Sequence, residues 1–350
     1  MRFLALFLAA LAMLSLLYVG IIRVVDPHGD FGTGLFPVVE TDLRTEKMRL
    51  FRAAMATAPP EGLILGSSRA MKVCPRTLEA ATGHRFFNFA VDTARAEDYL
   101  AIYRWVRQQG ARIKFLVIGL DVEALHDDDR PEGSLIVNDA LMSTLGPSAL
   151  RDPGLLGELR RYRLVRMVKK YKATFTIEYL TDALHSIGLV LRPDSKPVPI
   201  MEFEPDGYLR YRRYEVERAA GTFRFDRDME RCLTKSLTRF DNMTQLSRRR
   251  RAYLRRVVDE ARADGSRVVV WITSLHPLTT RYLEAHTGYV ALLAATREYE
   301  QALAGEEGIA TYDFSRPESY QGTVSGWYDC LHVDETNADR MATALVRELR

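Results

Sequence analysis

The order of apolar and polar positions along the chain predicts an alternation of strands and helices. Runs with the length and composition of strands occupy residues 62–66, 86–90, 113–120, 267–273 and 309–314. Three of them contain a continuously apolar stretch, which is typical of strands covered by helices on both faces. The intervening helices are predicted over residues 96–109, 245–263, 280–304 and 335–349. We therefore expect an α/β fold, a three-layer α/β/α sandwich with a mostly parallel, flavodoxin-like sheet.

The N-terminal pattern is different. Residues from Phe3 to Ile22 form a run of 20 uncharged, mostly apolar residues, enough for a helix of about 30 Å. A signal peptide usually has a shorter apolar core and a small-x-small cleavage site, which the end of this run does not offer. We interpret residues 1–24 as an uncleaved transmembrane anchor, with a buried core helix as the alternative. Arg2 favours a cytoplasmic N-terminus, although Arg23 on the other side weakens the bias.

The rest of the chain divides by pattern. Residues 25–60 read as a linker and an amphipathic stretch, residues 61–126 and 251–350 as the catalytic domain, and residues 127–250 as a largely helical, basic insertion. An apolar segment over 175–191 within the insertion is interrupted by Glu178, Asp182 and His185, so no second membrane span is expected. The stretch Arg160–Lys172 carries seven basic residues and no acidic one. It fits either a solvated helix face or a surface that rests on anionic lipid or an acidic polymer.

Composition narrows the choice of partners. The chain has 350 residues, 47% of them hydrophobic, and a formal net charge of only +3, so we expect no nucleic-acid partner. Its histidines show no metal-ligand spacing, and we expect neither a metal nor a cofactor. Of the three cysteines, Cys74, Cys232 and Cys330, one pair could form a disulfide, but the spacing does not show which.

The candidate chemistry lies where strands end. Ser68 follows the first strand, and Asp329 and His332 follow the last one. Because the carboxyl ends of parallel strands meet at one edge of a sheet, these side chains are expected to converge. A serine hydroxyl becomes a nucleophile when an imidazole removes its proton, and a carboxylate orients that imidazole. Each of these two segments also has a plain structural explanation. Gly-Ser-Ser is often only a turn, and an Asp before a helix is often a cap.

Two motifs carry a resemblance to a known family. The first is the strand and turn Leu63-Ile64-Leu65-Gly66-Ser67-Ser68, and the second is Asp329-Cys330-Leu331-His332 before the last helix. The chain resembles the SGNH/GDSL hydrolase superfamily, and within it the membrane-anchored extracytoplasmic branch, similar to DltD of lipoteichoic acid D-alanylation and to the alginate O-acetylation proteins. The resemblance implies Ser68 as nucleophile, His332 as general base and Asp329 as its orienting carboxylate. A helix starting after the serine would aim backbone N–H groups at the oxyanion.

Other positions match the family less closely. Its second block places a glycine after an Asn-containing strand. This chain has Asn88, which is expected to take part in oxyanion or substrate binding, followed by Thr93, whose backbone N–H would serve as the donor. Its third block offers an Asn side chain to the oxyanion, and this chain has Asp121, which as a carboxylate cannot donate. Arg69 is expected to be either an ion-pair partner or a clamp on an anionic substrate. His276 follows a strand and reads as a pocket or core residue.

The resemblance implies an extracytoplasmic serine hydrolase or O-acyltransferase that acts on acyl esters of a cell-envelope or exported polysaccharide. Its relatives work beside a membrane-bound O-acyltransferase. We would place the protein in the bacterial inner membrane as a single-pass protein with the catalytic domain in the periplasm. The alternative is a non-catalytic scaffold or glycan-binding accessory of such an acyltransferase. A nucleotide- or phosphate-binding protein ranks below both, because a Gly-rich phosphate loop is missing from the sequence.

Overall fold

A computed structural model describes residues 2–28, 31–39, 42–127, 133–136, 138–146, 176–192, 201–236, 240, 245–347 and 349. The chain divides into two compact units, one made of Met1–Thr45 and Leu159–Val198 and the other of Glu46–Glu158 and Pro199–Arg350. The expected insertion over residues 127–250 therefore does not form one unit, because its middle part groups with the N-terminal residues. The basic stretch Arg160–Lys172 lies outside the described residues.

The larger unit is built on a five-stranded parallel sheet with the order β2-β1-β3-β6-β7. The strands are β1 (Gly62–Leu65), β2 (Phe86–Asn88), β3 (Phe115–Leu120), β6 (Arg267–Ile272) and β7 (Ala310–Asp313). Apart from the separate β4–β5 hairpin, this is the flavodoxin-like order 2-1-3-4-5. The four residues of β1 are fully buried, as the continuous apolar run predicts. The predicted fold class is confirmed.

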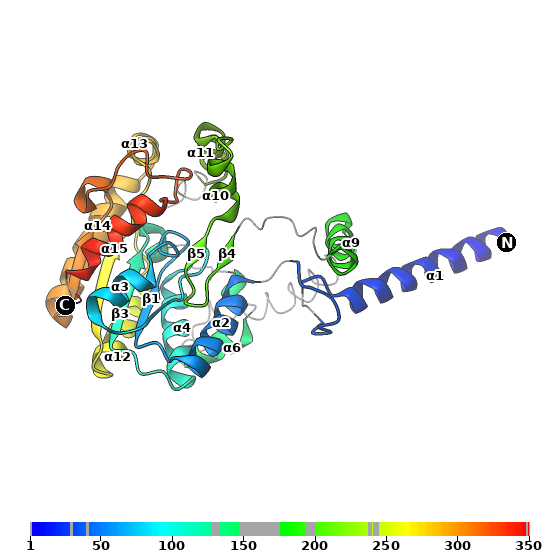
Figure 1. The fold of residues 1–350 in the computed structure, drawn as a ribbon, viewed down its shortest axis with the longest axis horizontal. Coiled ribbons are helices and arrows are strands. Elements are labelled where there is room, and N and C mark those ends of the chain that lie inside the picture. The colour runs from blue at the N-terminus through cyan, green and yellow to red at the C-terminus, as the bar shows by residue number, and fades with distance from the viewer. Residues whose placement is uncertain are drawn as a thin grey trace. The chain divides into compact units, whose positions relative to one another are not determined.

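Helices cover both faces of this sheet (Figure 1). Helix α3 packs with α15 and α4 packs with α12, which makes the outer layers of the sandwich. The helices around the sheet are α2 (Leu43–Thr57), α3 (Pro75–Thr82), α4 (Ala96–Gln108), α5 (Gly133–Ile136), α6 (Asp139–Met142), α10 (Arg212–Ala219), α11 (Phe225–Ser236), α12 (Arg248–Ala263), α13 (Pro277–His286), α14 (Tyr289–Glu307) and α15 (Glu335–Val346). Short 3-10 turns form η1 (Val122–Leu125), η2 (Ser143–Leu145) and η5 (Pro317–Tyr320).

The helix expected over residues 280–304 was wrong as a single element. The structure has two helices there, because Thr287 adopts an extended backbone at the end of α13 and Gly288 starts α14. The short helix α3 was not predicted at all. Pro75 in its first turn and Gly83 at its end, with a φ of 72°, are the ordinary start and stop signals that would have indicated it.

A small antiparallel hairpin ties the second half of the expected insertion to the sheet. It consists of β4 (Glu202–Phe203) and β5 (Leu209–Arg210). The Asn88 backbone N–H donates to the carbonyl of Asp206 at 2.8 Å. Gly207 has a φ of 79°, and a Cβ there would lie 2.2 Å from the Asn88 carbonyl oxygen, so only glycine fits this approach. Residues 201–210 therefore belong structurally to the sheet edge beside β2.

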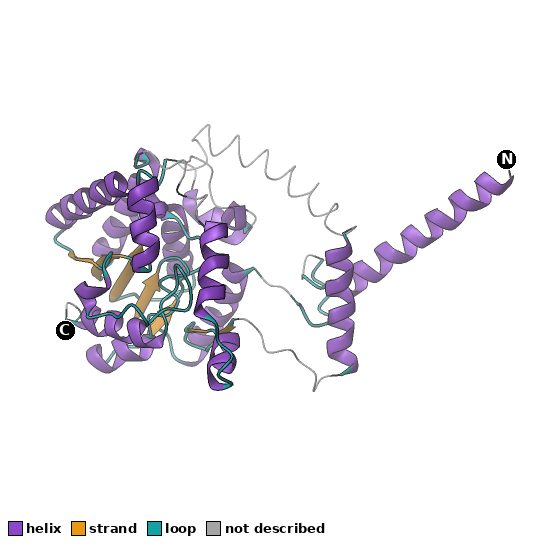
Figure 2. Cartoon of the chain, turned by 90° about the horizontal axis from the view of Figure 1, so that it is seen from above, coloured by secondary structure: helices purple, strands orange, loops and turns teal. Residues whose placement is uncertain are grey.

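The smaller unit contains two described helices, α1 (Arg2–Val25) and α9 (Ile177–Leu191). The stretch Phe3–Val25 is long and apolar enough to cross a membrane, and most of its side chains are exposed. Helix α9 packs against the last turns of α1, where Tyr179 and Ala183 meet Ile22 and Val25. Figure 2 shows α9 running across the end of α1 rather than alongside it.

Candidate active site

Ser68 lies at the carboxyl end of β1, in a turn that two glycines allow. Gly66 has a φ of 149°, and a Cβ on it would lie 2.5 Å from that of Ala70 and 3.0 Å from the carbonyl oxygen of Gly119. Gly119 itself, on β3, has no room for a Cβ because Trp271 and Ala70 lie within 2.9 Å of that position. The turn that carries Ser68 can therefore settle directly onto the end of the sheet.

The expectation of a helix directly after the serine was wrong. Residues 68–73 form turns, and α3 begins only at Pro75. The N–H groups of Ala70 and Met71 donate to the carbonyls of Ser67 and Ser68 within this turn. Helix α3 thus begins seven residues after Ser68, with a turn between them, and its first residues do not directly follow the serine.

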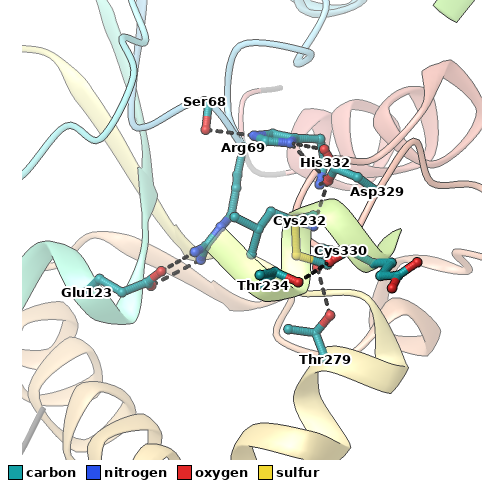
Figure 3. The surroundings of a disulfide bond; sticks show 11 residues. Ser68, Arg69, Glu123, Cys232, Thr234, Thr279, Asp329, Cys330 and His332 are labelled. Carbon is teal, nitrogen blue, oxygen red and sulfur yellow. Dashed lines mark hydrogen bonds and ion pairs between the residues drawn. A yellow bond between two sulfur atoms is a disulfide. The ribbon is translucent and has the colours of Figure 1, made fainter. Parts of the chain in front are cut away.

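Ser68, His332 and Asp329 form a continuous hydrogen-bonded relay (Figure 3). His332 Nε2 lies 2.9 Å from Ser68 Oγ, and its Nδ1 lies 2.9 Å from Asp329 Oδ2. Asp329 Oδ1 also accepts the backbone N–H groups of Leu331 and His332, each at 2.8 Å. The same carboxylate therefore shapes the loop and orients the ring. The segment after β1 and the segment before α15 therefore meet at one edge of the sheet.

The electrostatics of the relay suit a general base. Burial on its own would raise the pKa of Asp329, but the imidazole of His332 and the two backbone N–H groups lower it below its usual value. For His332 burial acts in the lowering direction, yet the charge of Asp329 and its hydrogen bond raise the pKa of the imidazole above 6.5. Asp329 thus stays ionised, while His332 is poised to accept a proton near neutral pH.

Asn88 supports the nucleophile turn and does not face a substrate. Its side chain is fully buried, and Nδ2 donates to the carbonyls of Ala70, Met71 and Val73. Its Oδ1 accepts the N–H of Ala90 at 3.0 Å. Because both ends of the amide are used, the expected role in oxyanion or substrate binding does not fit the structure. Asn88 instead holds the turn after Ser68 against the end of β2.

Arg69 and Asp121 form a buried charge cluster beside the relay. The Arg69 guanidinium pairs with the carboxylate of Glu123 and lies 3.5 Å from Asp121 Oδ1. Thr273 donates its hydroxyl to Asp121 Oδ1 at 2.5 Å. Burial alone would lower the pKa of Arg69, but the two carboxylates raise it. Arg69 is 7% exposed and doubly paired, so it fits the expectation of an ion-pair partner and not that of a clamp on an anionic substrate.

Thr93 has an unusual backbone at the position of the expected glycine. Its φ is 49°, in the left-handed region that glycine favours and β-branched residues avoid. The side chain is half-buried. Thr93 thus has a backbone conformation that a glycine adopts more easily. That its backbone N–H serves an oxyanion stays a prediction.

A cluster of tyrosines that sequence reasoning missed lies beside His332 and contacts it through Tyr211. The ring of Tyr211 lies 5.9 Å from the imidazole and 5.2 Å from the ring of Tyr328. Tyr214 stacks on Tyr328 with their centroids 4.7 Å apart. Tyr211 and Tyr214 follow the β4–β5 hairpin, in the segment interpreted as an insertion, and only the packing of that hairpin on the sheet edge brings them to the relay.

A disulfide joins Cys330, which lies between Asp329 and His332, to Cys232 on α11 (Figure 3). The two Cα atoms are 5.6 Å apart, and 98 residues separate them in the sequence. Cys74 is the free cysteine. The Cys330 carbonyl accepts the His276 N–H at 3.2 Å and the Thr279 hydroxyl at 3.0 Å. The loop that carries Asp329 and His332 is therefore fixed from two sides, by α11 and by the start of α13.

His276 is a core residue that caps a helix. It is 1% exposed, and its Nδ1 accepts the N–H of Leu278 at the start of α13. Burial lowers the pKa of its imidazole, which keeps it neutral. Within the described part of the chain, no group of three His, Cys, Asp or Glu side chains is placed to hold a metal ion.

Comparison with known proteins adds no relative. No protein-family model matches the sequence, and no curated protein matches it. The function therefore has to be derived from the fold and from the geometry of these side chains.

Proposed function

We propose that this protein cleaves or transfers an acyl ester through Ser68. The observation that carries the proposal is the relay in which His332 lies 2.9 Å from the Ser68 hydroxyl and 2.9 Å from Asp329. As Ser68 Oγ attacks the acyl carbonyl, His332 takes its proton. The bond to the alcohol then breaks, His332 returns the proton to the leaving oxygen, and an acyl-serine remains. Water or a sugar hydroxyl, deprotonated by His332, completes the reaction.

The substrate class follows from the resemblance to the SGNH/GDSL superfamily. The flavodoxin-like strand order and the positions of Ser68 and His332 at opposite ends of the chain support membership of its membrane-anchored branch. On that basis the substrate is an acylated cell-envelope or exported polysaccharide. The partner is a membrane-bound O-acyltransferase that supplies the acyl group. Aromatic rings beside His332 suit a sugar substrate, because ring faces pack well against its apolar C–H groups.

The location proposed is the periplasmic face of the bacterial inner membrane. Two independent features support it. Helix α1 is long and apolar enough to span a membrane. The Cys232–Cys330 disulfide suits an oxidising compartment, since such bonds are rare in the cytosol. A cytoplasmic N-terminus, with Ser68 and His332 on the periplasmic side, agrees with both the apolar helix and the disulfide.

One observation favours a second function, a non-catalytic scaffold or glycan-binding accessory. Asp121 stands where the family offers an Asn donor, and the described contacts bind its carboxylate to Arg69 and Thr273. An oxyanion would then rely on backbone donors alone. Losing one side-chain donor costs about 3 kcal/mol of transition-state stabilisation, which slows such an enzyme without abolishing its reaction.

The deciding experiment is labelling of the full-length protein with a fluorophosphonate probe, which reacts with activated serines. Wild type and Ser67→Ala are expected to be labelled, and Ser68→Ala is not. Ser67 is the matched control because it is the neighbouring serine and is buried. Hydrolysis and transfer are then compared with an acetylated polysaccharide, with and without an acceptor oligosaccharide. Folded wild-type protein that stays unlabelled and turns over no ester, yet binds the polysaccharide, would favour the scaffold.

A further inference from the structure

Helix α9 leaves a line of large apolar side chains uncovered. Ile177, Leu184 and Leu191 are 84%, 60% and 75% exposed. They are spaced seven residues apart, about two helical turns, so they share one face of the helix. Asp182 and His185 face elsewhere, since Asp182 binds the imidazole of His28 at 2.8 Å and His185 is rotated by about 100° from Leu184. Large exposed apolar side chains that share one face mark an interaction surface.

The contacts of α9 show which part of α1 it packs against. The Tyr18 hydroxyl lies 3.4 Å from the carbonyl oxygen of Thr176, the residue that caps the start of α9. One turn further on, Tyr179 and Ala183 pack against Ile22 and Val25. Helix α9 therefore meets α1 over its last two turns. Figure 2 shows it crossing the end of α1, not extending along it.

This level corresponds to the edge of a bilayer. Tyrosine and arginine are typical of the zone where hydrocarbon meets headgroups, and Tyr18 and Arg23 both lie near the end of the apolar run. The rise from Tyr18 to Val25 is only about 10 Å, so α9 stays within that zone. With 15 residues, α9 measures about 22 Å, too short to span a membrane but suited to lying in its surface.

We propose that α9 is an interfacial membrane helix and that Ile177, Leu184 and Leu191 insert into the lipid around the outer end of α1. The occupant of this surface is the bilayer itself, because α9 packs against the end of α1, a helix whose own apolar side chains are exposed along its length. The inference rests on α1 spanning the membrane, as the proposed function requires. It adds that the smaller unit is held flat on the membrane by a second, non-spanning contact.

The test uses full-length protein in lipid nanodiscs, with single cysteines labelled by bimane. Cys74→Ser removes the free thiol, and the disulfide shields the other two cysteines. Leu184→Cys probes the apolar line, His185→Cys is the matched control one position away, and Leu11→Cys reports on α1. A mixture of lipids brominated at shallow and at deep positions of the acyl chain quenches labels in the membrane, and iodide quenches labels in water. We expect brominated lipid to quench Leu184→Cys at least threefold more than His185→Cys, with the reverse order for iodide.

Three results would overturn the proposal, and each is distinct. If Leu11→Cys is quenched by brominated lipid while Leu184→Cys and His185→Cys respond alike to iodide, α1 spans and α9 lies in water. If Leu184→Cys is protected from both quenchers, protein covers the line, either a second copy or a partner. If Leu11→Cys is not quenched by brominated lipid, α1 does not span the membrane, and the membrane location in the proposed function is wrong as well.

Discussion

The carboxylate of Asp121 lies 3.5 Å from the guanidinium of Arg69, and both side chains are buried beside the nucleophile turn. Asp121 stands at the position where the resembling family has an Asn donor. The pKa of Asp121 is raised overall, because the effect of burial outweighs the opposing charge of Arg69. This position therefore stabilises a charge cluster under the turn that holds Ser68.

Asp121→Asn separates a structural from a catalytic role. The variant keeps the shape and removes the charge that faces Arg69, so we expect the free energy of unfolding to fall by about 2 kcal/mol, with Glu123 left to balance the guanidinium. Urea titration of the full-length protein in detergent measures this. The ester turnover number is expected not to rise. A tenfold rise with unchanged stability would mean that the side chain at 121 faces the reacting carbonyl.

The pH dependence of turnover tests the relay. Only neutral His332 can accept a proton, and Asp329 raises its pKa, so kcat/KM is expected to increase with pH through a midpoint above 6.5. In Asp329→Asn that support is lost while burial still lowers the pKa. The midpoint should then move to lower pH, and kcat should fall by about 10⁴-fold. An unchanged midpoint in the variant would exclude Asp329 as the partner of His332.

The disulfide can be removed without touching the relay. Cys232→Ala opens a bond that closes a long loop, and we expect the free energy of unfolding to fall by about 2–5 kcal/mol. The Asp329–His332 loop loses one of its two supports, so kcat should fall by about tenfold or more. Cys74→Ala is the control and should change neither quantity appreciably. Thiol titration of denatured wild type should find one free cysteine before reduction and three after it; three before reduction would contradict the pairing.

Thr93→Gly tests whether the left-handed backbone at this position lowers the free energy of unfolding. Glycine adopts a φ of 49° without steric penalty, so we expect the variant to be about 1 kcal/mol more stable and to retain its turnover. Thr93→Val keeps the β-branch and removes only the hydroxyl, and it should also keep its turnover if the backbone N–H is the group that matters. Loss of activity in Thr93→Val, with Thr93→Gly equally inactive, would assign the role to the hydroxyl.

Glu300 is a buried acid away from the relay, on α14. Burial raises its pKa to about 9, and within the described residues its Oε1 has no hydrogen-bond partner. Its pKa is higher in the folded than in the unfolded chain, so its contribution to stability is complete at low pH and is lost as pH rises from about 4.5 toward 9. Glu300→Gln cannot ionise and should be more stable than wild type at pH 7, by up to about 3 kcal/mol. Thermal unfolding at pH 5 and pH 8 measures this: the difference between the two proteins should be larger at pH 8.

The sheet and the relay follow from features that a sequence displays directly. Continuous apolar runs such as Val268–Ile272 are typical of strands covered on both faces, and parallel strands place Ser68 and His332 at one edge. The break between α13 and α14 was missed because the apolar spacing continues across Thr287 and Gly288. The extended backbone of Thr287 ends α13, although the apolar spacing would continue the helix.

The roles of the other polar residues depend on packing that no spacing reveals. Asn88 looks like a substrate ligand until its amide is found to be consumed by the carbonyls of the turn after Ser68. Three cysteines allow three pairings, and only the docking of α11 against the Asp329–His332 loop selects Cys232 with Cys330. Tyr211 reaches His332 because Gly207 lets the hairpin approach Asn88 closely.

The position of the relay along the chain has a consequence for biosynthesis. Ser68 belongs to the first strand, whereas His332 immediately precedes the final helix, 264 residues later. During synthesis the serine therefore emerges long before its imidazole partner, and a nascent chain that stops short of residue 332 lacks the base that the proposed function requires.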